Sequence, residues 1–240
     1  VYSKETISKP PDQEAKKAID NFINLGCTLQ ETREILTNEI DWRIKCGARI
    51  LVSTPREDIG ASMLIAEDLS PKINVPVEVV PMEELEKVLS NSNNGTIVTS
   101  RYFLQPIKKV AKQHGVRAIA VDLSDFQKEL KILKEFNAGS CVGIVSISPG
   151  LLRAAEVIIH SIRGSELILM TAISDNNSRL LSLLKTANLI VCDGPSLSVV
   201  ENTLLKNRSQ LMRLPQIICA KNYLSIETIN QLKKEIGVIN

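Results

Sequence analysis

The fold is decided by a short apolar run, Ile50-Leu51-Val52-Ser53-Thr54-Pro55, which has a counterpart later in the chain. The counterpart, Ile144-Val145-Ser146-Ile147-Ser148-Pro149, lies 94 positions further on and also ends in a hydroxyl residue followed by proline. Two more pairs of runs share a similar offset, 96–100 with 189–193 and 118–122 with 216–220. Buried parallel strands resemble one another, so each match alone is weak. The shared offset favours an internal duplication.

Short apolar runs alternate with helical patterns from residue 48 onward, which is typical of βαβ units and a parallel sheet. A single eight-stranded barrel would fit the number of units, but the repeat favours two similar open parallel-sheet lobes, like those of periplasmic binding proteins. We therefore predict an α/β fold with a first lobe at 48–140 and a second at 141–240. The expected strands are 49–53, 77–80, 96–99, 118–121, 142–147, 167–172, 189–192 and 216–219, and the helices between them should begin near Asp58, Glu83, Tyr102, Asp125, Leu151, Asn176, Ser196 and Ile226.

A helical hairpin is expected at 12–47, after a linker at 1–11. Its second helix begins with Thr28-Leu29-Gln30-Glu31, which fits a capping box. This helix carries two apolar stripes more than about 90° apart, one formed by Leu29, Leu36, Ile40 and Ile44 and the other by Ile35 and Trp42. The first stripe can pack on the preceding helix, and the second can dock either on the following domain or on a second copy of the chain. We predict a homodimer with Ile35 and Trp42 in the interface.

Composition narrows the class of protein. Hydrophobic residues make up 44% and charged residues 23% of the 240 residues, as in a globular protein with a core. The net charge of +2 provides no basic stripe for DNA or for a membrane surface. No apolar run approaches the roughly 18 residues of a membrane span, and nothing reads as a signal peptide. An odd number of scattered cysteines indicates a reducing compartment, so we expect a cytoplasmic protein.

Polar residues follow the expected strands at the edge where open α/β sheets bind ligands. If the two lobes face each other, these edges line a cleft suited to a small polar or anionic effector. Serine and threonine at such turns often only cap the next helix, which is the simpler interpretation of each one singly. The candidate effector residues are Thr54, Ser100, Arg101, Asp122, Ser148, Asp175 and Asp193, with Ser53 and Ser174 at the same level.

Sequence motifs of catalysis are absent. The chain contains no nucleotide-binding glycine motif, no nucleophile elbow, no H-E-x-x-H and no C-x-x-C, and its two histidines, His114 and His160, suit structural positions. We predict no cofactor, no metal and no catalytic residue. The competing hypothesis is an Asp/Glu racemase-like enzyme, in which each lobe supplies one cysteine as acid or base. Cys192 would be one of them, but the corresponding position in the first lobe is Thr99.

Two cysteines flank the second helix of the hairpin. Cys27 and Cys46 would lie roughly 27 Å apart at a helical rise of 1.5 Å per residue, so they cannot bridge within one chain. Across a dimer interface they can, and we regard them as redox candidates. Cys192 and Cys219 sit in apolar strands as small core residues.

The hairpin resembles a known family. The segments 14–26 and 28–36 resemble the helices that follow the winged helix in GntR-type repressors of the YtrA subfamily, and the appended lobes resemble the cyanobacterial PlmA-like regulators of that family. The resemblance implies a dimeric transcription factor whose winged helix precedes Val1 and which alone contacts DNA. It also implies the nitrogen-signalling proteins PII and PipX as partners. A cleft that has lost its effector, leaving a pure protein-interaction platform, is the third possibility.

Overall fold

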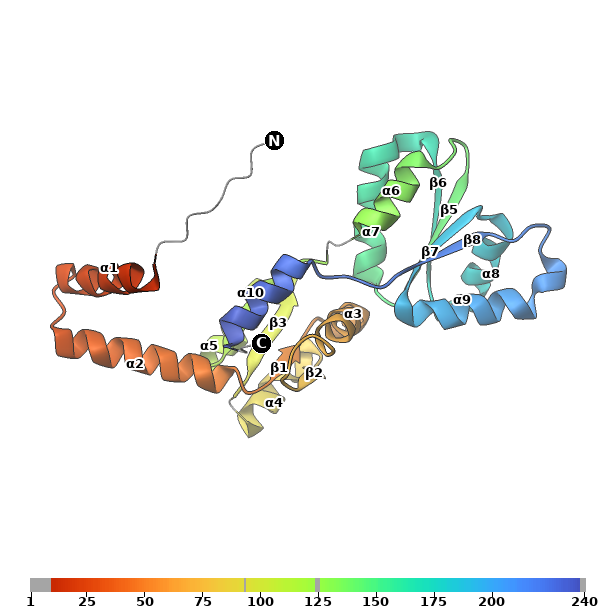
Figure 1. Ribbon diagram of the computed structural model, residues 1–240. Helices are drawn as coiled ribbons and strands as arrows, with labels where there is room; N and C mark the ends of the chain where they lie inside the picture. Colours follow the sequence, from red (N-terminus) through yellow and green to blue (C-terminus); the bar gives the residue numbers. More distant parts are fainter. Residues whose placement is uncertain (1–9, 93, 124–125, 238–240) are drawn as a thin grey trace, which may run out of the picture. The chain divides into compact units, whose positions relative to one another are not determined.

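The computed structural model describes residues 10–92, 94–123 and 126–237, and the chain divides into two compact units between Lys45 and Cys46 (Figure 1). The first unit is the helical hairpin, and the second contains two four-stranded parallel sheets. The predicted α/β fold with two sheet-containing lobes is confirmed. The linker expected at 1–11 lies almost wholly outside the described residues, as does the helix start expected near Asp125.

The hairpin consists of α1 (Pro11–Asn24) and α2 (Leu29–Cys46). The capping box forms as predicted, because the Thr28 backbone N–H donates to the Glu31 carboxylate at 2.7 Å and the Glu31 N–H donates to the Thr28 hydroxyl at 3.2 Å. These bonds lower the pKa of the Glu31 carboxyl, since they stabilise its charged form. Helix α1 has no buried residue, and Leu29 and Ile44 of α2 are 69% and 68% exposed. The hairpin therefore has little core of its own.

Each lobe of the second unit contains one sheet with the same strand order. The first sheet is ordered β2-β1-β3-β4 and the second β6-β5-β7-β8, and all neighbouring strands are parallel. The strands are β1 (Ile50–Val52), β2 (Val77–Val79), β3 (Thr96–Ser100), β4 (Arg117–Val121), β5 (Cys141–Ser146), β6 (Ile168–Ile173), β7 (Leu189–Asp193) and β8 (Gln216–Ala220). All eight predicted strands are present, within one residue of the expected bounds at most ends. The identical order in both lobes is what a duplication would produce.

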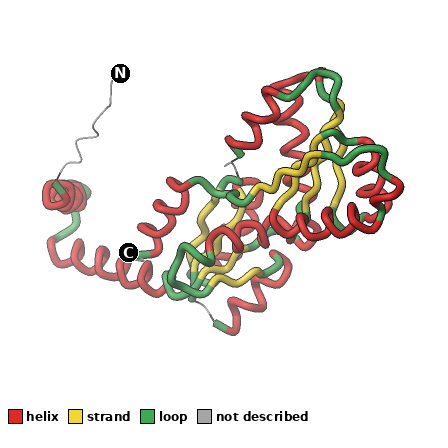
Figure 2. The backbone as a smooth tube through the Cα atoms, turned by 45° about the vertical axis from the view of Figure 1, so that its right-hand side comes forward, coloured by secondary structure: helices red, strands yellow, loops and turns green. Residues whose placement is uncertain are grey.

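Helices cover both faces of each sheet, as Figure 2 shows, so the central strands are buried on both sides. Along β1, Ile50 and Val52 contribute to the core on one face, whereas Leu51 contributes to the core on the other. This explains why the strand reads as a continuous apolar run rather than an alternating one. The helices are α3 (Ile59–Leu69), α4 (Leu85–Asn91), α5 (Leu104–Gln113), α6 (Gln127–Glu135), α7 (Pro149–Arg163), α8 (Asn177–Thr186), α9 (Gly194–Lys206) and α10 (Ile226–Ile236).

Two helices pack in the lobe to which the sequence division does not assign them. Helix α6, which follows β4, contributes Leu133 to the core of the second sheet together with Val142 and Ile159. Helix α10, which follows β8, contributes Ile229 and Leu232 to the core of the first sheet. The chain thus passes from one lobe to the other twice, and each lobe is completed by the final helix of the other repeat. The spacing of apolar residues in the sequence cannot reveal this exchange. It indicates that a segment is helical, but it does not indicate which sheet the helix packs against.

A close contact inside the second lobe gives a first prediction. A Cβ atom on Gly143, in the middle of β5, would lie 2.3 Å from a methyl group of the buried Leu183 on α8. Gly143→Ala should lower the free energy of unfolding by about 1–3 kcal/mol through overpacking. Chemical denaturation of Gly143→Ala, Leu183→Ala and the double variant measures this. The double variant should lose less than the two single losses together, and strictly additive losses would contradict the prediction.

Candidate functional site

The carboxyl edge of the first sheet contains buried hydroxyl groups that have no hydrogen-bond partner among the described residues. These are the side chains of Ser53 at the end of β1 and of Thr99 and Ser100 at the end of β3. The Ser53 backbone N–H donates to the Val98 carbonyl at 2.9 Å, so the two strand ends lie side by side. An unpaired buried hydroxyl costs about 1–3 kcal/mol, and such groups in a native fold indicate an unseen water or ligand.

Arg101 and Asp122, both predicted effector residues, bind each other. The Arg101 Nε donates to the Asp122 carboxylate at 3.1 Å, and its Nη2 contacts the second carboxylate oxygen. Bonding to Asp122 raises the pKa of the Arg101 guanidinium, which is 75% exposed. The pair is therefore solvent-exposed, and Asp122 makes the bidentate contact that Arg101 could otherwise offer to a ligand.

On the second lobe, the predicted residues cap helices. The Ser148 hydroxyl accepts a hydrogen bond from the Leu151 N–H at 3.0 Å and caps α7. The Asp193 carboxylate accepts from the Ser196 N–H at 2.8 Å, which caps α9, and from the Ile147 N–H at 2.9 Å. Asp175 is exposed just before α8, whose cap is Asn176. For Ser148 and Asp193 the capping interpretation therefore holds.

The two lobes touch through a residue that sequence reasoning did not select. Asp58, which is only 5% exposed, reaches from the start of α3 to the N-terminus of α7. Its Oδ1 accepts hydrogen bonds from the Ser148 hydroxyl at 2.7 Å and from the Gly150 N–H at 3.2 Å. The Thr54 hydroxyl donates to the backbone carbonyl of the same residue at 2.7 Å. Asp58 thus brings together Thr54 and Ser148, one predicted effector residue from each lobe.

The far end of α3 holds a second buried carboxylate. Asp68 accepts hydrogen bonds from the Tyr223 and Leu224 N–H groups at 2.9 and 2.7 Å, on the segment that leads from β8 to α10, and it pairs with Lys72. Next to it, the Glu67 carboxylate lies near Gly194, where a Cβ would be 3.1 Å from Glu67 Oε1. The pKa of Glu67 is raised, first by partial burial and then by the negative charges of Asp193 and Asp68. We call these contacts, from Asp58 to Tyr223, the inter-lobe seam.

Apolar contacts fill the seam between the two carboxylates. Leu64 of α3 packs with Ala220 and Tyr223, and Ile147 and Leu151 pack against this cluster. The Tyr223 hydroxyl donates to the Ala220 carbonyl at 3.0 Å and accepts from the Gly194 N–H at 2.7 Å, so the buried ring has both a donor and an acceptor satisfied. Helix α3 of the first lobe is therefore in direct contact with the carboxyl edge of the second sheet.

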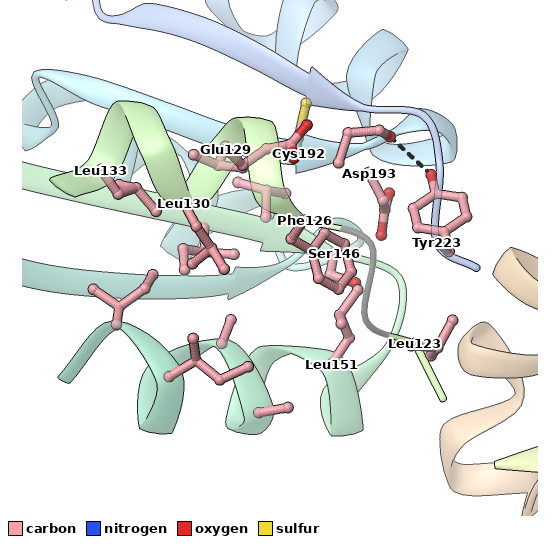
Figure 3. A pocket seen from close by; sticks show the side chains of 18 residues that line it. Leu123, Phe126, Glu129, Leu130, Leu133, Ser146, Leu151, Cys192, Asp193 and Tyr223 are labelled. Atoms are coloured by element: carbon pink, nitrogen blue, oxygen red, sulfur yellow. Dashed lines mark hydrogen bonds between the residues drawn. The ribbon is translucent and has the colours of Figure 1, made fainter. Parts of the chain in front are cut away.

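The second lobe also contains an apolar cavity of about 80 Å³ between α6, α7 and the sheet. Leu130 and Leu133 line it from α6 and Leu151 from α7, while Asp193 and Tyr223 lie at one end (Figure 3). Its wall is mostly apolar, so it suits a small apolar molecule rather than the polar effector that we expected. None of the seven candidate residues except Asp193 lines this cavity.

The cysteines have different surroundings. Cys192 is 1% exposed, and burial followed by the neighbouring Cys219 raises the pKa of its thiol to about 12. A thiol with such a pKa is poorly suited to acid–base catalysis near neutral pH. Of the redox candidates, Cys27 is partly exposed and Cys46 is buried, so Cys27 is the more accessible to an oxidant. The described residues contain no group of three or more metal-binding side chains placed to hold an ion.

A model of a known protein family matches the second lobe. Residues 128–221 match the family model described as cyanobacterial PlmA-type GntR regulator, C-terminal domain. This part of the chain is similar to a PlmA-type C-terminal domain. It begins in α6 and ends just after β8, which are the limits of the second lobe as it packs. The family of transcriptional regulators predicted from the sequence is therefore confirmed over this range, which is less than half of the chain.

No curated protein matches the chain. None of the described helices is long and apolar enough to cross a membrane. The PlmA-type domain is a regulatory domain, and its matched range includes the capping residues Ser148 and Asp193 but neither Asp58 nor the unpaired hydroxyls of the first lobe.

Some of the functional residues that sequence reasoning missed carry a recognisable signal in the sequence, and others do not. Asp68 falls in the apolar pattern of α3 beside Leu64, Ile65 and Leu69, and an acidic residue within such a stripe indicates a buried, hydrogen-bonded carboxylate. Tyr223 lies in the short segment that follows the last strand, Gln216–Ala220. Asp58 gives no such signal, because an acidic residue at a helix start is ordinarily solvent-exposed.

The seam carboxylates predict a pH-dependent effect at Glu67. Because its pKa is raised above the reference value of 4.5, the charged form destabilises the folded state at neutral pH, and this cost disappears once the pH falls below 4.5. Glu67→Gln should therefore raise the melting temperature at neutral pH, and the gain should vanish in acid. Thermal unfolding across this range measures it, with Glu86→Gln on α4 controlling for the loss of one charge. A gain that is independent of pH would exclude this cause.

Proposed function

We propose that this chain is the dimerisation and effector- or partner-sensing part of a transcriptional regulator. The match of the second lobe to the PlmA-type C-terminal domain is the observation that supports the regulatory role. We assign no DNA-binding role to the residues described here. We assign dimerisation to the hairpin, because Ile35 of its second apolar stripe is exposed and because the regulators that the chain resembles are dimeric.

The exposed apolar side chains of the hairpin support dimerisation. Leu29, Ile35, Ile40 and Ile44 of α2 are all exposed, and α1 exposes Ile23. Two helices without a core are marginal in water, and burial of apolar area contributes about 25 cal/mol per Å². A second copy of the same hairpin supplies the required surface, since such interfaces are self-complementary.

Replacing one interface side chain by a charge tests dimerisation. Trp42→Asp should convert a dimer into a monomer, because an unpaired carboxylate would be buried in the interface. Trp42→Phe, which keeps the apolar ring, should remain dimeric. Light scattering of both variants of the whole chain measures the mass, and a fully dimeric Trp42→Asp variant would rule out this interface.

For the sensing role we propose a small polar or anionic effector at the carboxyl edge of the first sheet. The unpaired hydroxyls of Ser53, Thr99 and Ser100 support this, because they are buried donors available to a ligand. The second candidate is a protein-interaction platform without an effector, which the direct contact of the lobes at the seam favours. PII and PipX, which the resemblance implies, are the candidate partners for either version.

Substitutions of two threonines on β3 distinguish the effector-binding role from the interaction platform. Thr99 has an unpaired hydroxyl, whereas the Thr96 hydroxyl donates to the Cys46 carbonyl at 2.9 Å. Thr99→Val should raise the free energy of unfolding by about 1 kcal/mol without ligand, and Thr96→Val should lower it by a similar amount. Thermal shift with amino acids, 2-oxo acids and nucleotides should show an effector that stabilises the wild type and Arg101→Ala but not Thr99→Val.

If no compound stabilises the wild type, the interaction platform is the better description. If Thr99→Val destabilises the protein, its hydroxyl has a structural water partner, and the proposed effector position is wrong.

A further inference from the structure

We infer that Asp58 is an intramolecular latch: its carboxylate occupies the anion-binding position at the N-terminus of α7 and thereby fastens the first lobe to the second. The inference rests on the contacts of the seam and does not depend on the proposed regulatory function. It concerns a residue outside the matched PlmA-type domain that acts on a helix within it.

The helix that Asp58 caps is suited to binding a negative charge. Helix α7 has 15 residues, and its first N–H groups point out of the helix with a partial positive charge. Ser148 satisfies the Leu151 N–H, and the Gly150 N–H is satisfied by Asp58. The carboxylate therefore takes the place that a carboxylate or phosphate group of a free ligand would take.

Two glycines make the approach of the lobes possible. A Cβ on Gly150 would lie 2.1 Å from Asp58 Oδ2, and a Cβ on Gly60 would lie 2.2 Å from the Ile147 carbonyl oxygen. Neither glycine has a positive φ angle, so backbone conformation does not explain them. The close contact between α3 and the start of α7 explains why both positions are glycine.

The covalent connections between the lobes do not by themselves enforce this contact. Asp58 lies in neither connection, since the chain passes between the lobes after β4 and after β8. Asp68 fastens the opposite end of α3 to the second connection through Tyr223 and Leu224. Helix α3 is thus fixed at one end to a connection and at the other, through Asp58, to the second lobe. Loss of the Asp58 contact frees one end of the seam and exposes the N-terminus of α7.

Removing the carboxylate should create an anion site. Asp58→Ala in the whole chain should gain a melting-temperature increase of about 3–5 °C when inorganic phosphate is about ten times its Kd, at constant ionic strength. The wild type should show no such increase, because its own carboxylate fills the site. Asp175→Ala, which removes an exposed carboxylate beside the start of α8, is the matched control and should behave as the wild type. Equal responses of the wild type and Asp58→Ala would overturn the inference.

A double-variant cycle tests the latch even if Asp58→Ala is poorly stable. Gly150→Ala places a methyl group against Asp58 and should lower the melting temperature in the wild-type background. In the Asp58→Asn background, which keeps a neutral side chain of the same shape, Gly150→Ala should still lower the melting temperature, but by less. In the Asp58→Ala background, Gly150→Ala should no longer lower the melting temperature. Hydrogen exchange at the Gly150 amide should accelerate in Asp58→Ala and stay slow in Asp175→Ala. An unchanged exchange rate, or additive effects of Gly150→Ala and Asp58→Ala, would overturn the latch.

Discussion

A carboxylate removed from water must be surrounded by hydrogen-bond donors, and the way in which α3 meets this requirement holds the second unit together. Asp58 and Asp68 are both buried, and each accepts hydrogen bonds from elements that come after the first sheet in the chain, while Asp68 also pairs with Lys72 of the first lobe. A buried carboxylate without such donors would destabilise the fold by several kcal/mol. The positions of α7 and of the segment before α10 are therefore constrained from the first lobe.

This constraint explains why the two carboxyl edges form a packed seam rather than an open cleft along α3. The polar residues that mark a ligand site in the sequence are used in different ways by the two lobes. On the second lobe Ser148 and Asp193 cap helices, whereas on the first lobe Ser53, Thr99 and Ser100 remain buried without partners among the described residues, as does the Ser196 hydroxyl of the second lobe. The two sheets thus share the same strand order, whereas the side chains at their carboxyl edges differ in their hydrogen bonds.

Much of the fold could be predicted from the sequence, because continuous apolar runs identify strands that are buried on both faces. The capping box at Thr28 was predictable for a similar reason, since its two hydrogen bonds lie within four residues. The site was less predictable. Thr54 and Ser148 were correctly placed at strand ends, but the residue that links them is Asp58, whose backbone carbonyl binds Thr54 and whose carboxylate binds Ser148, 90 positions later. The exchange of α6 and α10 depends on tertiary packing that local patterns do not encode.

The exchange of these two helices has a consequence for synthesis on the ribosome. The elements of the second lobe, from α6 to β8, form one continuous stretch of chain, so this lobe is complete as soon as β8 has emerged. The first lobe, although its strands are made earlier, lacks the part of its core that α10 contributes until Ile226–Ile236 emerges. The second lobe can therefore be completed before the first, and one face of the strands made first stays partly uncovered until the last helix is made.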